Sequence, residues 1–387
     1  MAVSRRSFIR IAGSSAVILA AGAAGIGGFA VTRAPEAARR PWQVAGQGYA
    51  DPRMRALSYA ILAPNPHNRQ PWLVDLAQAD TVMLYCDRTR LLPETDPFNR
   101  QILIGLGCFL ELLAIAAAQD GYQATIVPFP DGVPGTQLDD RPVARIDFRR
   151  SDLVKPDPLF AQILNRRSNK KPYDTSLTVP AAELAAIAAT TGPTATVRTT
   201  ADADMVRELR ALTWQAHETE VMTPRTYMES VRLMRIGKAE IDASPDGIDI
   251  GGAFPDAMNL LGVLNRETIA DPASTAFEQG MAMYRDIMGS AMAYVWITTK
   301  GNSRTEQLAA GRAWVRLNLV ATGRGVAVHP VSQALQEFDE MSGLFDRLHA
   351  LLAGEDGGRI QMLGRLGYAA RPEPSLRWPL ATRVKTA

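Results

Sequence analysis

"RRSNKKPY" (166–173) carries more recognisable chemistry than any other stretch of the chain. Arg166, Arg167, Ser168 and Lys170 place two guanidiniums, a hydroxyl and an ammonium within about one and a half helical turns, and Pro172 stops any helix that precedes it. A phosphate suits such a group, because it binds forked guanidinium donors and a positive point charge. From spacing alone, however, a solvated basic turn is the commoner outcome.

A second unusual stretch, "APNPHNRQPWL" (63–73), lies about a hundred residues earlier in the chain. Pro64 and Pro66 lack amide donors and push the residues before them toward extended geometry, so this run cannot be helical throughout. The residues before it, 49–62, have apolar positions at helical spacing. The pattern therefore predicts a shaped loop at the C-terminus of a helix.

The rest of the chain predicts two cycles of similar order, each with a long buried central helix, which indicates an internal duplication of one α+β unit. Strands follow from alternating or continuous apolar runs. The first cycle has helices at 49–62, 99–121 and 157–167 and strands at 72–76, 81–87, 123–130 and 143–149. The second has short helices from Ala181, at 202–221 and at 228–238, a central helix at 304–323, and strands at 291–299, 325–333 and 359–369.

Composition excludes several classes of function. The formal charge is +2 and basic residues are interleaved with acids, so no stripe exists of the kind that nucleic acid requires. The four histidines show no metal-ligand spacing, and we expect no metal. Cys86 and Cys108 fall in unrelated elements, where two buried thiols are more frequent than a disulfide bridge.

The N-terminus predicts export. Arg5 and Arg6, followed by Phe8 and a weakly apolar run at 11–31, indicate a twin-arginine signal read by the Tat export machinery. Cleavage after Ala30 would release a periplasmic protein, and a retained signal would leave it attached to the membrane. We expect a signal at 1–30 and a linker at 31–48.

Both motifs resemble those of the nitroreductase superfamily. "RRSNKKPY" resembles its Arg-Arg-Ser-x-Arg motif, and "PNPHNRQPW" resembles its Pro-Ser-Ser-x-Asn-x-Gln-Pro-Trp loop. "DRTRLLPETDPFNRQILIGLGCFLE", "GVAVHPVSQALQE" and "GRLGYAARPEPSLR" resemble the fused, Acg-type branch that binds FMN. The resemblance implies an α+β, nitroreductase-like fold of two fused repeats, 49–155 and 156–387, that form a pseudo-dimer within one chain.

The resemblance also implies one FMN per chain and names the residues that would hold it. Arg166, Arg167 and Ser168 would grip the phosphate region, Lys170 would lie near flavin N1 and O2, and Arg377 would close on the phosphate. The opposite wall would consist of Pro64, Asn65, Pro66, His329, Pro330, Val331 and Ser332. Asn65 and Pro66 depart from the two serines of the motif, and Ser375 stands where many members have a lysine. Gln70 and Trp72 are expected to be structural, and His67 is more often a packing residue than an acid or base in such a loop.

These features favour an FMN-dependent oxidoreductase that passes two electrons to a small electron-poor acceptor outside the cytoplasm. NAD(P)H is scarce there, so a membrane quinol or a redox protein is the expected donor. The alternative is a protein that stores FMN without turnover, under a lid formed by residues 222–258; a plain surface loop is the other interpretation of that segment. We expect a monomer, and the pattern names no catalytic residue.

Overall fold

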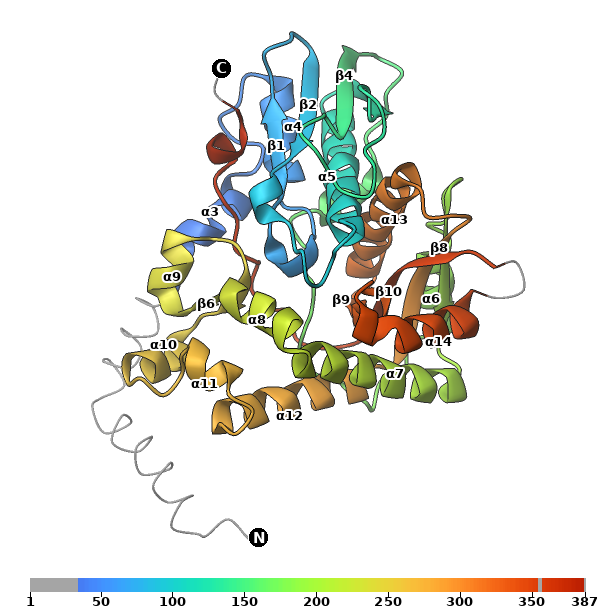
Figure 1. Cartoon of the computed structure of the whole chain (residues 1–387). Helices are drawn as coiled ribbons and strands as arrows, with labels where there is room; N and C mark the ends of the chain where they lie inside the picture. The colour runs from blue at the N-terminus through green and yellow to red at the C-terminus, as the bar shows by residue number, and fades with distance from the viewer. Residues whose placement is uncertain (1–33, 354–356, 386–387) are drawn as a thin grey trace.

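The computed structural model describes residues 34–353 and 357–385, which form two four-stranded antiparallel sheets with helices packed between and around them (Figure 1). The first sheet has the order β1 (Trp72–Asp75), β2 (Thr81–Cys86), β4 (Ala144–Arg150) and β3 (Tyr122–Pro128). The second has the order β5 (Ala195–Thr200), β8 (Ala293–Thr299), β10 (Arg359–Gly367) and β9 (Ala327–Pro330). The predicted α+β fold of two fused repeats is confirmed.

One long helix from each repeat occupies the centre of the molecule, where the two lie side by side (Figure 1). These are α5 (Arg100–Gln119) and α13 (Arg304–Gly323), each of 20 residues. α5 is long and apolar enough to cross a membrane, but 83% of its most apolar window is buried inside the protein. It is a core helix, as its all-round apolarity predicted.

The two helices touch at a pair of glycines, Gly107 and Gly311, each the eighth residue of its helix. A Cβ atom on Gly107 would lie 2.2 Å from the carbonyl oxygen of Leu308, and one on Gly311 would lie 2.0 Å from the carbonyl oxygen of Ile104. Ile104 and Leu308 are both fifth residues, so the contact is reciprocal, as across a two-fold axis. The backbones can approach this closely only because neither residue has a side chain.

The first residue of each central helix repeats this reciprocity. Arg100 is fully buried and donates to the carbonyl oxygens of Leu335 (2.7 Å) and Gln361 (2.6 Å) in the second repeat. Arg304 donates to the carbonyl oxygens of Phe98 (2.6 Å) and Thr136 (2.6 Å) in the first repeat. Each repeat therefore holds loops of the other repeat through hydrogen bonds from the arginine that begins its central helix.

The remaining elements surround this centre. They are α3 (Glu36–Val44), α4 (Pro52–Ala60), α6 (Ala181–Ala188), α7 (Ala203–Met222), α8 (Pro224–Leu233), β6 (Met234–Ile236), α9 (Gly237–Ala243), β7 (Ile248–Ile250), α10 (Ala253–Leu260), α11 (Arg266–Ala270), α12 (Thr275–Gly289) and α14 (Ser342–Leu352). Short 3-10 turns are η1 (Pro66–Asn68), η2 (Arg88–Arg90), η3 (Pro158–Gln162), η4 (Gln333–Leu335), η5 (Asp339–Met341) and η6 (Leu380–Arg383). Elements α8 to α12 fill the connection between α7 and β8, which is far longer than its counterpart in the first repeat.

Several expectations from the sequence were wrong in detail. The helix expected at 157–167 is the 3-10 turn η3 followed by turns and non-regular backbone, because the polar run ahead of Pro172 sustains no helix. The helix expected at 228–238 is instead the end of α8, strand β6 and the start of α9. The expected linker, 31–48, contains helix α3, whose Ala38 and Trp42 are buried. The expected signal at 1–30 lies outside the described residues.

Cys86 and Cys108 are both buried and free, which confirms the interpretation as two separate thiols. Cys86 is on β2, and Cys108 is on α5, where its Sγ donates to the carbonyl oxygen of Gly311 at 3.1 Å. The second thiol therefore contributes to the crossing of α5 and α13.

We expect Gly311→Ala to destabilise the protein by about 2 kcal/mol or more, because the added methyl group must push the central helices apart. The matched control is Gly280→Ala on α12, where no atom lies within 4 Å of an added Cβ. That change should leave stability unchanged or raise it by up to about 1 kcal/mol. Thermal unfolding followed by circular dichroism compares the two variants, and equal midpoints would contradict the crossing as described.

Candidate functional site

The loop after α4 is held in a backbone conformation that few side chains favour. His67, Asn68 and Gln70 have φ values of 45°, 52° and 51°, in the left-handed region. Asn65 fixes the turn, since its Oδ1 accepts from the Gln70 amide at 2.7 Å and its Nδ2 donates to the Ala63 carbonyl at 3.1 Å. Strain of this kind persists only where surrounding contacts over-determine it, and it is common at functional sites.

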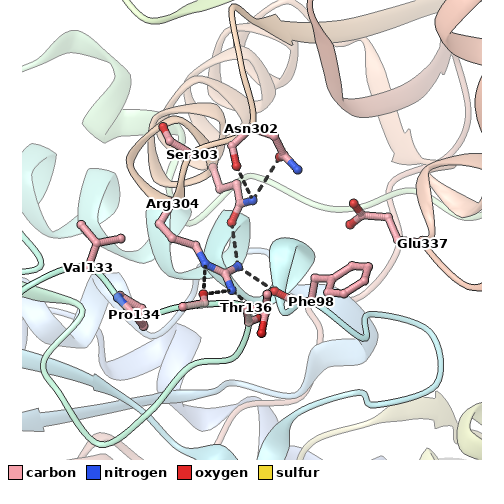
Figure 2. A pocket seen from close by; sticks show the side chains of 10 residues that line it. Phe98, Val133, Pro134, Thr136, Asn302, Ser303, Arg304 and Glu337 are labelled. Carbon is pink, nitrogen blue, oxygen red and sulfur yellow. Dashed lines mark hydrogen bonds between the residues drawn. The ribbon is translucent and has the colours of Figure 1, made fainter.

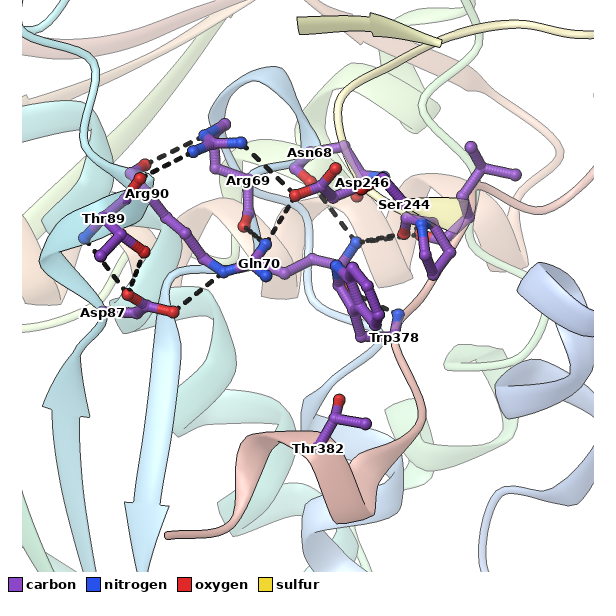
Figure 3. Close-up of polar contacts among 12 residues, drawn as sticks. Asn68, Arg69, Gln70, Asp87, Thr89, Arg90, Ser244, Asp246, Trp378 and Thr382 are labelled. Carbon is purple, nitrogen blue, oxygen red and sulfur yellow. Dashed lines mark hydrogen bonds and ion pairs between the residues drawn. The ribbon is translucent and has the colours of Figure 1, made fainter. Parts of the chain in front are cut away.

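Gln70 supplies much of that constraint from a fully buried position (Figure 3). Its Nε2 donates to the carbonyl oxygen of Pro245 at 2.8 Å, and its Oε1 accepts from the amide of Trp378 at 2.9 Å. Trp72 is also fully buried and stacks on Phe109, with ring centroids 5.2 Å apart. The burial and the contacts of Gln70 and Trp72 are those of structural residues.

The segment 222–258 packs on this loop through one carboxylate. Asp246 accepts from Arg90 and Arg235 at 2.6 Å each and from Arg69 at 3.4 Å, and its side chain is 5% exposed (Figure 3). Beside it, the amide of Gly247 donates to the carbonyl oxygen of Asn68 at 3.2 Å. The segment therefore covers the loop; its opening as a lid stays a prediction.

The segment 166–170 contacts both stretches that were predicted to form the opposite wall. Arg166 Nη2 donates to the carbonyl oxygen of Leu62 at 3.3 Å, immediately before the loop. Three residues on, the amide of Asn169 donates to the carbonyl oxygen of Val328 at 2.9 Å, on the strand β9 that carries His329. The structure thus brings together the three stretches that the sequence selected.

Arginines gather around the ring of Trp42. The guanidinium carbons of Arg166, Arg167 and Arg377 lie 5.9, 4.9 and 5.4 Å from its centroid. Desolvation lowers the pKa of both Arg166 and Arg167 to about 10, and neighbouring arginines add to the effect at Arg167. Cations packed against one another in a poorly solvated place create a strong demand for an anion.

Some of the nitrogen donors in this cluster have no acceptor from the protein. Among the described residues, Arg166 Nη1, Arg167 Nε and the Nε of Arg39 on α3 are buried without a hydrogen-bond partner. Glu373 pairs with Arg39 at 3.8 Å, but its side chain is 75% exposed. Buried donors without acceptors are rare in native proteins and point to a missing ligand or water. Sequence analysis missed Arg39 and Trp42 because it took their segment for a linker.

Arg377 has a different role from the one predicted. The residue is 1% exposed, and its guanidinium donates to the carbonyl oxygens of Ile61, Leu62 and Ala63 at 2.7, 3.1 and 2.9 Å. The remaining nitrogen, Nη1, donates to Asn68 Oδ1 at 2.6 Å, Ser375 Oγ at 2.8 Å and the Leu376 carbonyl at 2.7 Å. All five N–H groups therefore have protein acceptors, so Arg377 holds the end of α4 and the loop and has no donor left for a phosphate.

Lys170 is the cation whose charge acts on both stretches of the predicted opposite wall. Its side chain is exposed, yet surrounding protein lowers its pKa by desolvation, against a smaller opposing effect of Asp249. Burial, followed by the charge of Lys170, lowers the pKa of His67 to about 4. His329 has its pKa lowered by burial, by Arg365 and by Lys170. The charge of Lys170 therefore acts on a histidine of each of these two stretches.

On the β9 wall the side chains are already engaged. His329 Nδ1 accepts from Arg365 Nε at 2.9 Å, deep in the protein, and the Ser332 hydroxyl donates to the Leu363 carbonyl at 3.1 Å. The Val331 amide donates to the Leu363 carbonyl at 2.9 Å. Pro330 has no amide donor and pairs with Gly364 in the sheet. Contacts from this stretch to a ligand would come from other backbone groups. Ser168 and Pro64 to Pro66 are half-buried.

A separate pocket of about 370 Å³ lies between the repeats at the start of α13, and Figure 2 shows Arg304 in it with its donors turned to main-chain oxygens. Its lining includes Phe98, Asn302, Gln307 and Glu337. None of the predicted cofactor residues lines it, and the polar groups of Arg304 and Glu337 are bound to protein. It is a gap between the two repeats. Among the described residues, none that line it has a buried donor without a partner of the kind found around Trp42.

Comparison with known proteins gives a sequence similarity that extends along most of the chain. A Mycobacterium tuberculosis protein named as an NAD(P)H nitroreductase, Rv3131, is 26% identical over 317 residues, 81% of this chain and 84% of that protein. A second protein from that organism named as an NAD(P)H nitroreductase, Acg, is 35% identical over 120 residues, 30% of this chain and 34% of its own length. No family model matches.

Solved structures of nitroreductases are similar at lower levels. NfnB of Mycobacterium smegmatis, in complex with NADPH, has a TM-score of 0.37 at 17% identity and covers 59% of this chain and 98% of its own. A protein from Anabaena variabilis named as a nitroreductase has a TM-score of 0.38 at 13% identity and covers 86% of this chain and 91% of its own. The nitroreductase superfamily is supported by the sequence similarity to Rv3131.

We expect Asp246→Asn to loosen the segment around Asp246 from the loop, because three arginines lose their shared charge; breaking a buried ion pair costs about 3–5 kcal/mol. Amide hydrogen exchange should rise at residues 65–70 and 244–250. Asp140→Asn is the matched control, since Asp140 pairs with Arg88 at the surface and is 90% exposed. Unchanged exchange in Asp246→Asn would show that other contacts hold the segment.

Proposed function

We propose that this chain is an FMN-dependent oxidoreductase of the nitroreductase superfamily that reduces a small electron-poor acceptor. The observation that carries the proposal is the pair of buried, unpartnered donors on Arg166 and Arg167, beside the unpartnered Nε of Arg39. A phosphate monoester fits this cluster, because it is a compact dianion that accepts several charged hydrogen bonds. Solved nitroreductases from Bacteroides fragilis and Desulfitobacterium hafniense have FMN bound.

Three parts of the chain would hold the cofactor. Arg166, Arg167 and Arg39 would bind the phosphate, with Ser168 beside them. Lys170 would lie along the ring, where a positive charge stabilises the anionic reduced form. The strained loop and the backbone after His329 would form the opposite wall, and Arg377 would keep that loop in place without touching the cofactor.

When bound, FMN supplies the two-electron chemistry, and the protein sets its position and potential. Lys170 favours acceptance of electrons through its charge. The fixed loop and the covering segment exclude water from the ring, which limits unproductive reoxidation. The packed loop needs no rearrangement to present its wall, since Asn65 and Gln70 already hold it.

The electron donor and the location are part of the proposal. A twin-arginine signal would carry the folded, loaded protein out of the cytoplasm, where NAD(P)H is scarce, so we propose a membrane quinol or a redox protein as donor. The contacts of Asp246 and Gly247 with the loop favour a second candidate function, storage of FMN under a closed segment. The two differ in whether small molecules reach the flavin.

The first test is the absorption spectrum of protein purified without residues 1–30, before and after addition of FMN, followed by anaerobic titration with NADPH and with a soluble quinol. A bound flavin that a donor bleaches and a quinone or nitro compound restores supports the enzyme. A bound flavin that neither reaches supports storage. Failure to bind FMN would overturn both.

We expect Arg166→Ala and Arg167→Ala each to weaken FMN binding by about 10- to 100-fold, since a charged hydrogen bond contributes about 1.5–3 kcal/mol. Lys170→Gln should lower the two-electron potential of the bound flavin by about 30 mV or more, which corresponds to about 1.4 kcal/mol. Fluorescence quenching and a reductive titration measure these effects. Arg145→Ala, at a surface ion pair with Asp147 on the first sheet, is the control that should change neither.

A further inference from the structure

Helix α3 supplies the ring against which two arginines of the candidate site lie. Trp42 is 5% exposed, and the guanidinium carbons of Arg167 and Arg166 lie 4.9 and 5.9 Å from the centroid of its ring. Arg39 precedes Trp42 by three residues on the same helix, so the two side chains share one face. This face therefore covers the two arginines and adds a third one. Among the described residues, each of the three arginines has a buried nitrogen without a partner.

Helix α3 has little stability of its own. It is nine residues long, and its N-cap residue, Pro35, makes no side-chain capping bond. Pro41 lies inside the helix and lacks the amide that would donate to the carbonyl oxygen of Ala37. Isolated helices shorter than about 12–15 residues are marginal in water even for good helix formers. The segment is therefore helical because it is docked on the rest of the protein.

The docked helix lies on the insertion and on the C-terminal segment. It is placed beside α9 (Figure 1), where Ala38 forms a small buried cluster with Ile241 of α9 and Leu376. Trp42 Nε1 donates to the carbonyl oxygen of Ser375 at 2.7 Å. These contacts join parts of the chain that are more than 130 residues apart, so the docking of α3 depends on tertiary structure alone.

A glycine turn connects α3 to α4. Gly46 and Gly48 both have a φ of 77°, in the region that favours glycine. The amide of Gly46 donates to Ser58 Oγ on α4 at 2.8 Å, whereas no described atom lies within 4 Å of a Cβ added to Gly48. The chain can therefore change direction at this turn without a change in α4.

The arginines make the docking of α3 sensitive to an anion. Desolvation lowers the pKa of both Arg166 and Arg167 to about 10, which means that their burial opposes their charge. Two changes relieve this cost. An anion can accept hydrogen bonds from the unpartnered nitrogens, or α3 can separate and let water reach Arg167 under Trp42. An anion therefore favours the docked helix, and its absence favours separation.

We infer that α3 is a clasp on the phosphate end of the proposed site, which docks on a phosphate ester bound to Arg166 and Arg167 and separates when that ligand is exchanged. In taking FMN as the ester, the inference rests on the proposed function. Arg39 reaches the phosphate from α3, and Trp42 keeps water from the ion pairs. Because coupling between two equilibria is reciprocal, the anion stabilises the docked helix as much as the docked helix strengthens the binding of the anion.

The test is amide hydrogen exchange of the full chain without ligand, with FMN, with riboflavin and with inorganic phosphate. Saturating FMN should slow exchange at residues 36–45 by about 10-fold or more, since one charged hydrogen bond corresponds to a factor of about 10–100. Riboflavin lacks the phosphate and should not slow exchange there. Strand β3, on the first sheet, should exchange equally in all four states.

A matched pair of variants tests the part of Arg39. Arg39→Gln should remove most of the slowing by FMN at residues 36–45 and raise the FMN dissociation rate by about 10-fold. Arg40→Gln is the control, because Arg40 is the next residue of the same helix and is exposed. It makes the same change of charge and helix propensity, and it should keep both wild-type values. An Arg39→Gln chain that also keeps them would overturn the clasp.

The outcomes separate the two proposals. If FMN binds but slows residues 36–45 no more than riboflavin does, the clasp is overturned and the proposed function stands. If FMN does not bind, the proposed function fails. In that case, slowing by inorganic phosphate alone supports a clasp on another phosphate, and no slowing overturns the clasp as well.

Discussion

The contact of Gly107 with Gly311 is the constraint on which the rest of the structure depends. The two central helices meet where neither has a side chain, and each glycine faces a main-chain oxygen of the other helix. A crossing this close fixes the two repeats relative to each other. It also seats the strained loop, because Gly105, two residues earlier, lies under Asn65 and Pro66, where a Cβ would be 3.0 Å from the Asn65 side chain. The packing of the central helices therefore fixes the position of the loop at the candidate site.

Buried charge is the second organising principle. Three arginines, Arg100, Arg304 and Arg377, donate hydrogen bonds to main-chain carbonyl oxygens. These bonds hold loops and the end of α4, where the carbonyl oxygens would otherwise be buried without a donor. Arg166 and Arg167 differ, since they are packed among other cations and keep unpartnered nitrogens. The contrast separates structural arginines from those available to a ligand, although Arg377 lies against the same Trp42 ring as Arg166 and Arg167.

The long insertion between α7 and β8 gives the second repeat features that the first lacks. At one end Asp246 ties it to the loop through three arginines. At the other end α12 stacks Tyr284 on His217 of α7. The insertion therefore breaks the internal symmetry of the two repeats and adds contacts to the strained loop of the first repeat.

The sequence by itself determined the elements whose signal is local. The central helix at 100–119 follows from continuous apolarity, β1 and β2 from alternation, and the loop at 64–70 from its prolines. The motif RRSNKKPY also selected Arg166, Arg167 and Lys170 as candidates. Only the tertiary structure decided which acceptor each side-chain donor reaches. Arg377 matches a motif, yet its five N–H groups are taken by the end of α4, while Arg39 and Trp42 lie in a segment whose helix is stabilised by packing on distant residues. Hydrogen-bond partners and desolvation depend on atoms far apart in the chain, and no local pattern records them.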